Sequence, residues 1–102
     1  MRTDQEVYKQ AIDFFGVRHQ VDLAVEEMSE LTKALMKYRR AEEKGAEDKT
    51  DERLSIIEEM ADVEVMFDQL KMIYDCESVV ALKKYLKTER LAKRLKEIED
   101  EA

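Results

Sequence analysis

Apolar residues recur at intervals of three and four along most of the chain, which is the spacing of a buried helix face. The clearest run lies between residues 18 and 43 and consists of Val21, Ala24, Met28, Leu31, Leu35 and Tyr38. Similar runs predict helices over about residues 4–15, 52–74 and 78–99. The pattern therefore predicts a single all-α domain of four helices that spans residues 1–102.

The ends of the predicted helices carry capping residues. Thr3 stands three residues before Glu6, which is the arrangement of a capping box at a helix N-terminus. Gly16 is expected to end the first helix, because glycine adopts the left-handed conformation that often follows a helix. The polar segment 44–51 contains Gly45 and is the predicted loop between the second and third helices.

The helix predicted over residues 52–74 is apolar on much of its circumference, and residues 75–77 connect it to the last helix. A helix that is apolar on several faces is central in a bundle or lies in an oligomer interface. The second and third helices are each roughly 35 Å long at 1.5 Å per residue, and the two flanking helices leave one side uncovered. We therefore expect a four-helix bundle completed by homo-oligomerisation, as a homodimer or a homotetramer.

Composition narrows the class of protein further. The chain has 25 acidic and 18 basic residues, a net charge of -7, no proline and two glycines. A β-sandwich needs many Gly and Pro turns, and a P-loop or GxGxxG motif needs clustered glycines, so these classes are excluded. The negative charge disfavours stable nucleic acid binding, which depends on clustered Lys and Arg.

Cysteine content and the N-terminal residues bear on the cellular compartment. Cys76 is the only cysteine, so neither a disulfide within the chain nor a cysteine-based zinc site can form. No apolar segment follows Met1, and no run approaches the roughly 18 apolar residues of a membrane span. We therefore expect a cytoplasmic protein that does not contact a membrane.

Two pairs of acidic residues interrupt the apolar faces of the second and third helices. Glu27 and Glu30 form one pair, and Glu59 and Asp62 form the other. Residues three apart lie on one helix face, with Cβ atoms about 5–6 Å apart. Neither Lys nor Arg stands three or four residues from Glu27, Glu59 or Asp62, and Glu30 has only Lys33. Unpaired carboxylates on neighbouring helices repel one another, and a hard divalent cation such as Mg²⁺ or Mn²⁺ relieves the repulsion.

Two other interpretations of these acids compete with an Mg²⁺ site. Acidic pairs on helices are common on solvated faces, where a basic residue usually stands nearby, as Lys93 stands four residues after Glu89. A di-iron carboxylate bundle uses Glu-x-x-His on two helices, but the single histidine, His19, has Gly16 three residues before it. The di-iron interpretation is therefore disfavoured.

The two acidic motifs together resemble a known family. The sequences EEMSEL at residues 26–31 and EEMADV at residues 58–63 are similar to the motifs of the MazG-like all-α nucleoside triphosphate pyrophosphohydrolases, which carry ExxE on one helix and ExxD on the next. The charged loop over residues 44–51 lengthens the separation between the motifs relative to the family. The resemblance covers most of the chain and implies a single-module, MazG-like helical bundle that is completed by homo-oligomerisation.

The resemblance also implies an activity and a set of site residues. The expected reaction is Mg²⁺-dependent hydrolysis of a (d)NTP to the monophosphate and pyrophosphate, a housecleaning of the nucleotide pool. Mn²⁺ is the expected substitute for Mg²⁺. The implied metal ligands are Glu27, Glu30, Glu59 and Asp62, and Glu26 or Glu58 is expected to orient the attacking water or a second ion.

Further residues are candidates for contact with the nucleotide. Lys33 lies one turn after Glu30 and can reach phosphate oxygens. Gln20 and His19 stand at the start of the second helix, where they can touch the base or the sugar. Basic residues on one face of the last helix resemble the C-terminal basic residues that help the family hold triphosphate; these are Lys87, Arg90 and Arg94. The resemblance allows them to act within their own chain or across a subunit boundary. The alternative for these three is pairing with carboxylates along the surface.

A second function class stays open at this point. The chain can also be a catalytically silent helical module for oligomerisation or partner binding, in which the acidic pairs meet a partner's basic residues. Stabilisation by Mg²⁺ and nucleotide separates the two, since a ligand of the folded state raises its stability. The sequence leaves the preferred base and sugar of an enzyme undetermined.

Overall fold

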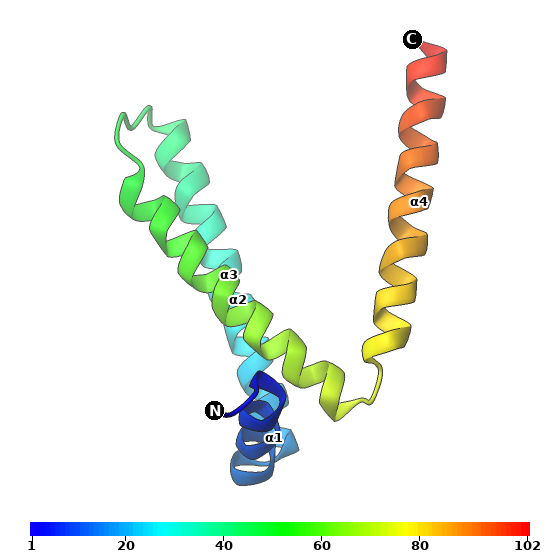
Figure 1. Ribbon diagram of the computed structural model, residues 1–102. Helices are drawn as coiled ribbons and strands as arrows, with labels where there is room; N and C mark the ends of the chain where they lie inside the picture. The colour runs from blue at the N-terminus through cyan, green and yellow to red at the C-terminus, as the bar shows by residue number, and fades with distance from the viewer.

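The computed structural model describes residues 1–102 and contains four helices and no strands. The helices are α1 (Asp4–Phe15), α2 (Val17–Glu43), α3 (Thr50–Ile73) and α4 (Glu77–Glu101), as Figure 1 shows. The prediction of an all-α chain with four helices is confirmed, and the observed bounds lie within two residues of the predicted ones. None of the helices has a stretch long and apolar enough to cross a membrane.

The first two helices are separated by a single glycine. At the start of α1, the Thr3 hydroxyl accepts a hydrogen bond from the backbone N–H of Glu6 at 3.1 Å, as the capping pattern predicts. At its end, the N–H of Gly16 donates to the carbonyl of Ile12, and α2 begins at Val17. Gly16 has φ 92° and ψ 152°, a conformation that is almost restricted to glycine. This residue therefore sets the angle at which α1 leaves α2.

Helices α2 and α3 run antiparallel, side by side, as a long hairpin (Figure 1). Residues 44–49 close one end of this hairpin, and α1 packs against both helices at the other, open end. Helix α4 contacts only α3 and diverges from the hairpin, so that the two form a V. The chain thus consists of a packed three-helix part and one projecting helix.

All six buried residues lie where α2 packs on α3, and this contact is called the α2–α3 seam from here on. Four of them are apolar, and two are glutamines: Ala24, Ala34, Val63, Met66, Gln20 and Gln69. Two members of the predicted apolar face of the second helix, Met28 and Leu35, are 37% and 45% exposed. Three of the six have small side chains, Ala24, Ala34 and Val63, and no aromatic side chain is buried in the seam.

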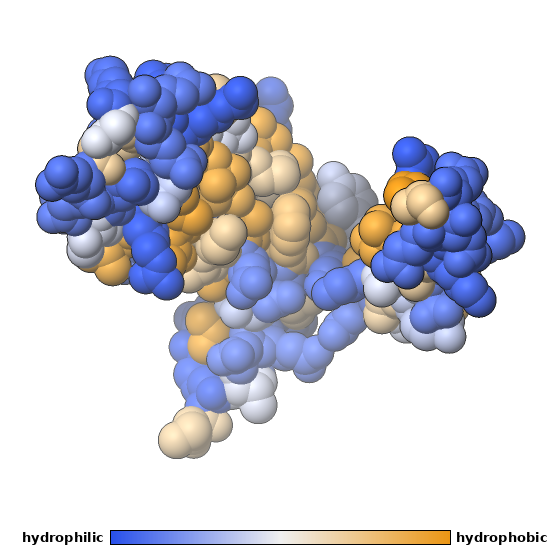
Figure 2. Space-filling view, turned by 90° about the horizontal axis from the view of Figure 1, so that it is seen from above, coloured by the Kyte–Doolittle hydropathy of each residue, from blue (hydrophilic) through white to orange (hydrophobic).

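A large apolar surface remains uncovered in the single chain. The accessible surface is 8615 Å², against about 6000 Å² for a compact protein of this mass. The radius of gyration is 18.1 Å, against about 13 Å for a compact chain of this length. Figure 2 shows apolar surface along the hairpin and on α4. Exposed apolar side chains include Ile57, Met60 and Phe67 on α3 and Leu82, Leu86 and Leu91 on α4.

We expect Gly16→Ala to lower the free energy of unfolding by about 1–3 kcal/mol, because alanine is strained at this φ and ψ. Space does not oppose the methyl group, since nothing lies within 4 Å of a Cβ built at this position. Urea unfolding of both proteins measures the difference. A variant as stable as the native chain would contradict the backbone account of this turn.

Candidate metal centre

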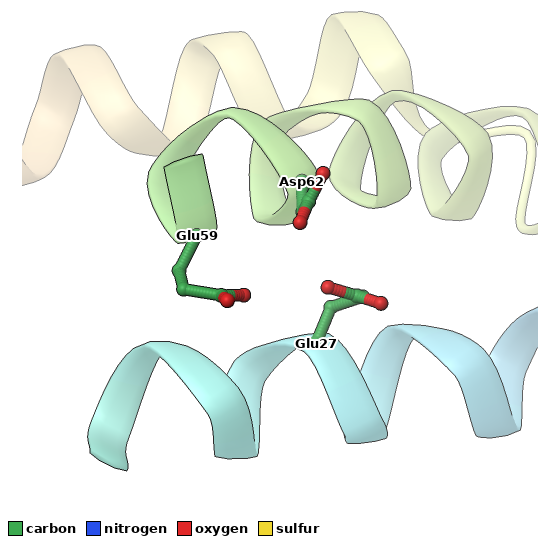
Figure 3. A group of neighbouring side chains, drawn as sticks. All are labelled: Glu27, Glu59 and Asp62. Atoms are coloured by element: carbon green, nitrogen blue, oxygen red, sulfur yellow. The ribbon is translucent and has the colours of Figure 1, made fainter. Parts of the chain in front are cut away.

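Three carboxylates converge across the α2–α3 seam. Glu27 projects from α2 toward Glu59 and Asp62, which project from α3, as Figure 3 shows. One carboxylate oxygen from each residue lies within 4.8 Å of the other two. The spacing of three between Glu59 and Asp62 places both on the face of α3 that meets α2. The structure therefore brings together three of the four acids that were predicted to hold a metal ion.

The burial of these carboxylates is uneven. Glu27 and Glu59 are half-buried, whereas Asp62 is exposed. The Oε2 atom of Glu59 is buried and has no hydrogen-bond partner. A buried polar atom without a partner loses its hydration with no compensating interaction, which makes the folded state less stable. A cation at this position would supply the missing interaction.

Burial and like charges raise the pKa of two of the carboxyl groups. Burial is the largest cause for Glu27, followed by the negative charges of Asp62 and Glu59, and a hydrogen bond with Asp62 adds to the effect. Burial is also the largest cause of the raised pKa of Glu59, followed by the charge of Asp62. The folded chain thus holds protons on Glu27 and Glu59 more tightly than the unfolded chain does.

The three carboxylates fit a hard divalent cation. Mg²⁺ binds oxygen at about 2.0–2.1 Å, so two of its ligands lie at most about 4.2 Å apart. The three oxygens lie within 4.8 Å of one another, which is close to this separation. All three donors are oxygen atoms, which favours Mg²⁺ or Mn²⁺ over softer metal ions.

The other predicted acids lie at the edge of this group or outside it. The charge of Glu30 contributes to the raised pKa of Glu59, but Glu30 is not among the three residues whose oxygens converge. The Glu30 carboxylate pairs with the ammonium group of Lys33 at 3.4 Å. Glu26 and Glu58, the candidates for orienting water, are exposed and are not among the three converging residues.

The predicted phosphate-binding residues divide into two sets. Lys33 is on α2, one turn from Glu30, and its ammonium group pairs with that carboxylate. Lys87, Arg90 and Arg94 are on α4, which does not contact α2 within one chain. Lys87 lines a groove between α3 and α4, with apolar side chains from both helices. A single chain therefore does not bring these three residues to the carboxylates.

The two residues predicted to contact the base, His19 and Gln20, are hydrogen-bonded to each other, and Gln20 is also bonded to Gln69. Gln20 is 2% exposed, and its amide nitrogen donates to Oε1 of Gln69 at 2.7 Å. His19 is exposed, stacks on Phe15 with ring centroids 5.2 Å apart, and its Nδ1 lies 2.7 Å from Oε1 of Gln20. The amide of Gln20 thus makes its hydrogen bonds within the chain. Sequence reasoning did not assign a role to Gln69, although a glutamine on the acidic face of the third helix was the available signal.

Comparisons of the chain with known protein families, with curated proteins and with solved structures found no match.

The raised pKa values predict how Glu59→Gln changes stability with pH in EDTA. A group whose pKa is raised by folding stabilises the native state at low pH and ceases to do so as pH rises through the folded pKa. Glutamine does not titrate, so the variant gains stability relative to the native chain as pH rises from about 4 to about 8. Thermal unfolding across this range measures the difference.

Glu64→Gln, on an exposed part of α3, makes the same change of charge and serves as the control. A stability difference that has the same pH dependence in both variants would contradict the carboxylate cluster.

Proposed function

We propose that the chain binds a divalent cation at Glu27, Glu59 and Asp62 and hydrolyses a nucleoside triphosphate to the monophosphate and pyrophosphate. The observation that carries the proposal is the convergence of these three carboxylates, one of which, Glu59, has a buried Oε2 without a hydrogen-bond partner. The resemblance of both acidic motifs to the MazG-like family supports the reaction class. Mg²⁺ is the proposed ion, and Mn²⁺ is its substitute.

The charge balance of the site explains why the reaction needs the ion. Three carboxylates repel a triphosphate, which carries several negative charges of its own. A bound Mg²⁺ supplies positive charge to the phosphate oxygens and to the attacking water. Phosphoryl transfer depends more on positioning and charge neutralisation than on covalent chemistry. The chain's own contribution is therefore to hold the ion and orient the triphosphate.

Several side chains around the three carboxylates have proposed roles. Glu30 would serve as a fourth ligand if Lys33 exchanged its carboxylate for a phosphate oxygen, since both side chains are partly exposed. Glu26 and Glu58 flank the cluster and are the candidates for orienting water through a change of rotamer. His19 remains a candidate for contact with the base, because its ring is exposed and already stacks on Phe15.

We propose a homo-oligomer, at least a dimer, as the working form. One chain exposes about 2600 Å² more surface than a compact protein of its mass. A standard interface buries about 800 Å² on each partner, and permanent dimers bury more. The excess is therefore large enough for a permanent dimer or a tetramer. Burial of the apolar faces of α3 and α4 against a second copy completes the bundle.

Oligomerisation also gives the basic residues of α4 a place at the site. Residues 83–96 contain seven basic side chains and one acidic one, whereas the rest of the chain contains 11 basic and 24 acidic side chains. Opposite charges favour contact between α4 of one copy and the hairpin of another. In this arrangement Lys87, Arg90 and Arg94 reach a triphosphate held by the partner's carboxylates.

We expect metal-dependent pyrophosphate release from a panel of NTPs and dNTPs, and its loss in EDTA. Glu59→Gln is expected to lower turnover by at least about 100-fold, because the ion loses a ligand and the site its charge balance. Glu64→Gln is the matched control and is expected to retain native turnover. Pyrophosphate detection with Mg²⁺, Mn²⁺ or EDTA measures all three proteins.

Absence of turnover across the panel, with no rise in melting temperature on addition of Mg²⁺, would contradict the proposal. The exposed apolar faces would then support the alternative, a catalytically silent module for oligomerisation or partner binding.

Mixing two inactive variants tests whether α4 acts on the partner's site. A dimer of one Glu59→Gln chain and one Arg90→Gln chain contains one intact site if Arg90 acts across the interface. An equal mixture then recovers about a quarter of native turnover, since half of the dimers are mixed. Pyrophosphate release after joint refolding measures the recovery. No recovery, although light scattering shows a dimer, would place Arg90 on its own chain's site or outside it.

A further inference from the structure

The two buried polar side chains of the α2–α3 seam are bonded to each other. Gln20 of α2 and Gln69 of α3 are 2% and 4% exposed, and they are 49 residues apart in the sequence. Their amides are joined by a hydrogen bond of 2.7 Å from Nε2 of Gln20 to Oε1 of Gln69. These two residues are called the glutamine pair below.

Each remaining polar atom of the glutamine pair also has a partner. With its proton on Nδ1, His19 donates to Oε1 of Gln20 at 2.7 Å. The Nε2 of Gln69 donates to the sulfur of Met66 at 3.6 Å. Neither amide contributes a buried atom without a hydrogen bond. Each side-chain oxygen and nitrogen of the pair thus has at least one hydrogen-bond partner in this alignment of α2 against α3.

The glutamine pair and the carboxylates occupy equivalent positions along the hairpin. Glu27 follows Gln20 by seven residues on α2, and Asp62 precedes Gln69 by seven residues on α3. The helices are antiparallel, so seven residues forward along α2 and seven residues backward along α3 cover the same distance in the same direction. Two turns from the contact between the amides, the helices therefore bring the carboxylates together. The alignment that joins the amides therefore also places Glu27 opposite Asp62.

Besides the glutamine pair, α1 and apolar side chains of the seam hold the open end of the hairpin, because α1 packs against both α2 and α3. The connection over residues 44–49 joins the helices at the far end, beyond the carboxylates. The apolar residues of the seam include Ala24 and Val63, whose small side chains make contacts without directional preference. A hydrogen bond between two buried amides is directional and is lost when either helix shifts by a turn.

We propose that the glutamine pair fixes the register of α2 against α3 and thereby holds Glu27 opposite Asp62 and Glu59 in the geometry that binds a divalent cation. Gln20 and Gln69 are positioning residues in this account, because they touch neither the ion nor a substrate. A shift of one turn would leave both amides buried without partners, so the register shown here is favoured over its neighbours.

The test replaces both amides by apolar side chains of similar length, in the variant Gln20→Met with Gln69→Met. Replacement of both partners removes the hydrogen bond without leaving an unpaired amide, so the chain is expected to fold with near-native melting temperature. A pair of leucines serves as a second variant. Gln5→Met, at an exposed position on α1, is the matched control.

The first measurement is Mn²⁺ binding by calorimetry. We expect the double variant to bind Mn²⁺ at least about tenfold more weakly than the native chain, in line with the loss of groups that orient metal ligands. Each single variant is expected to be less stable than the double variant, because one buried amide is left without a partner. Native affinity in a folded double variant would overturn the positioning role.

The second measurement determines the register of α2 against α3 from a distance between the two helices, and it needs no metal ion. Spin labels at Asp22→Cys on α2 and Glu64→Cys on α3, in a Cys76→Ser background, report the distance between the helices by pulsed electron resonance. Labelled chains are diluted with unlabelled ones, so that only distances within one chain are seen. We expect one distance in the native chain and an added distance in the double variant, where α2 and α3 shift by about 5.4 Å, one helical turn.

The two measurements separate this proposal from the proposed function. The Mn²⁺ measurement rests on the proposed metal site, and a native chain that does not bind Mn²⁺ contradicts that site alone. The spin-label distances test the register whether or not the metal binds. A single, unchanged distance in the folded double variant would overturn the register role, even if Mn²⁺ affinity falls.

Discussion

The contact between α2 and α3 is the interaction on which the rest of the structure depends. It contains every buried residue of the chain, and α1 and α4 contribute none. Burial of apolar surface is the dominant favourable term in folding, so a seam with only four buried apolar residues gives one chain limited stability. The apolar faces of α3 and α4 are exposed in one chain. In the proposed oligomer, their burial against a second copy adds to the stability of the folded state.

The same seam carries charges that oppose its packing. Like charges at Glu27, Glu59 and Asp62 meet where the helices approach each other, and burial adds to their cost. A protein retains such an arrangement when another group offsets the repulsion, and a divalent cation does so with all-oxygen ligands. The repulsion and burial of these three carboxylates thus explain both the lower stability of the metal-free seam and the proposed affinity for the ion.

Sequence patterns predict the four helices and their ends because capping residues and apolar spacing act locally, as Thr3 and Gly16 illustrate. Helix periodicity also places Glu59 and Asp62 on one face of α3, and the absence of nearby basic residues marked them and Glu27 as unpaired acids. Two features are not local and were not predicted. The bond between Gln20 and Gln69 depends on the register of two helices, and the divergence of α4 depends on tertiary packing.

The central claim is that the three carboxylates of the α2–α3 seam hold a divalent cation. A crystal structure of the chain grown with Mn²⁺ tests this most directly, since anomalous scattering locates the ion independently of the protein. The account predicts a manganese peak between α2 and α3, with an oxygen ligand from each of Glu27, Glu59 and Asp62. A saturated crystal with no peak at this position, and with the carboxylates turned toward solvent, would contradict it.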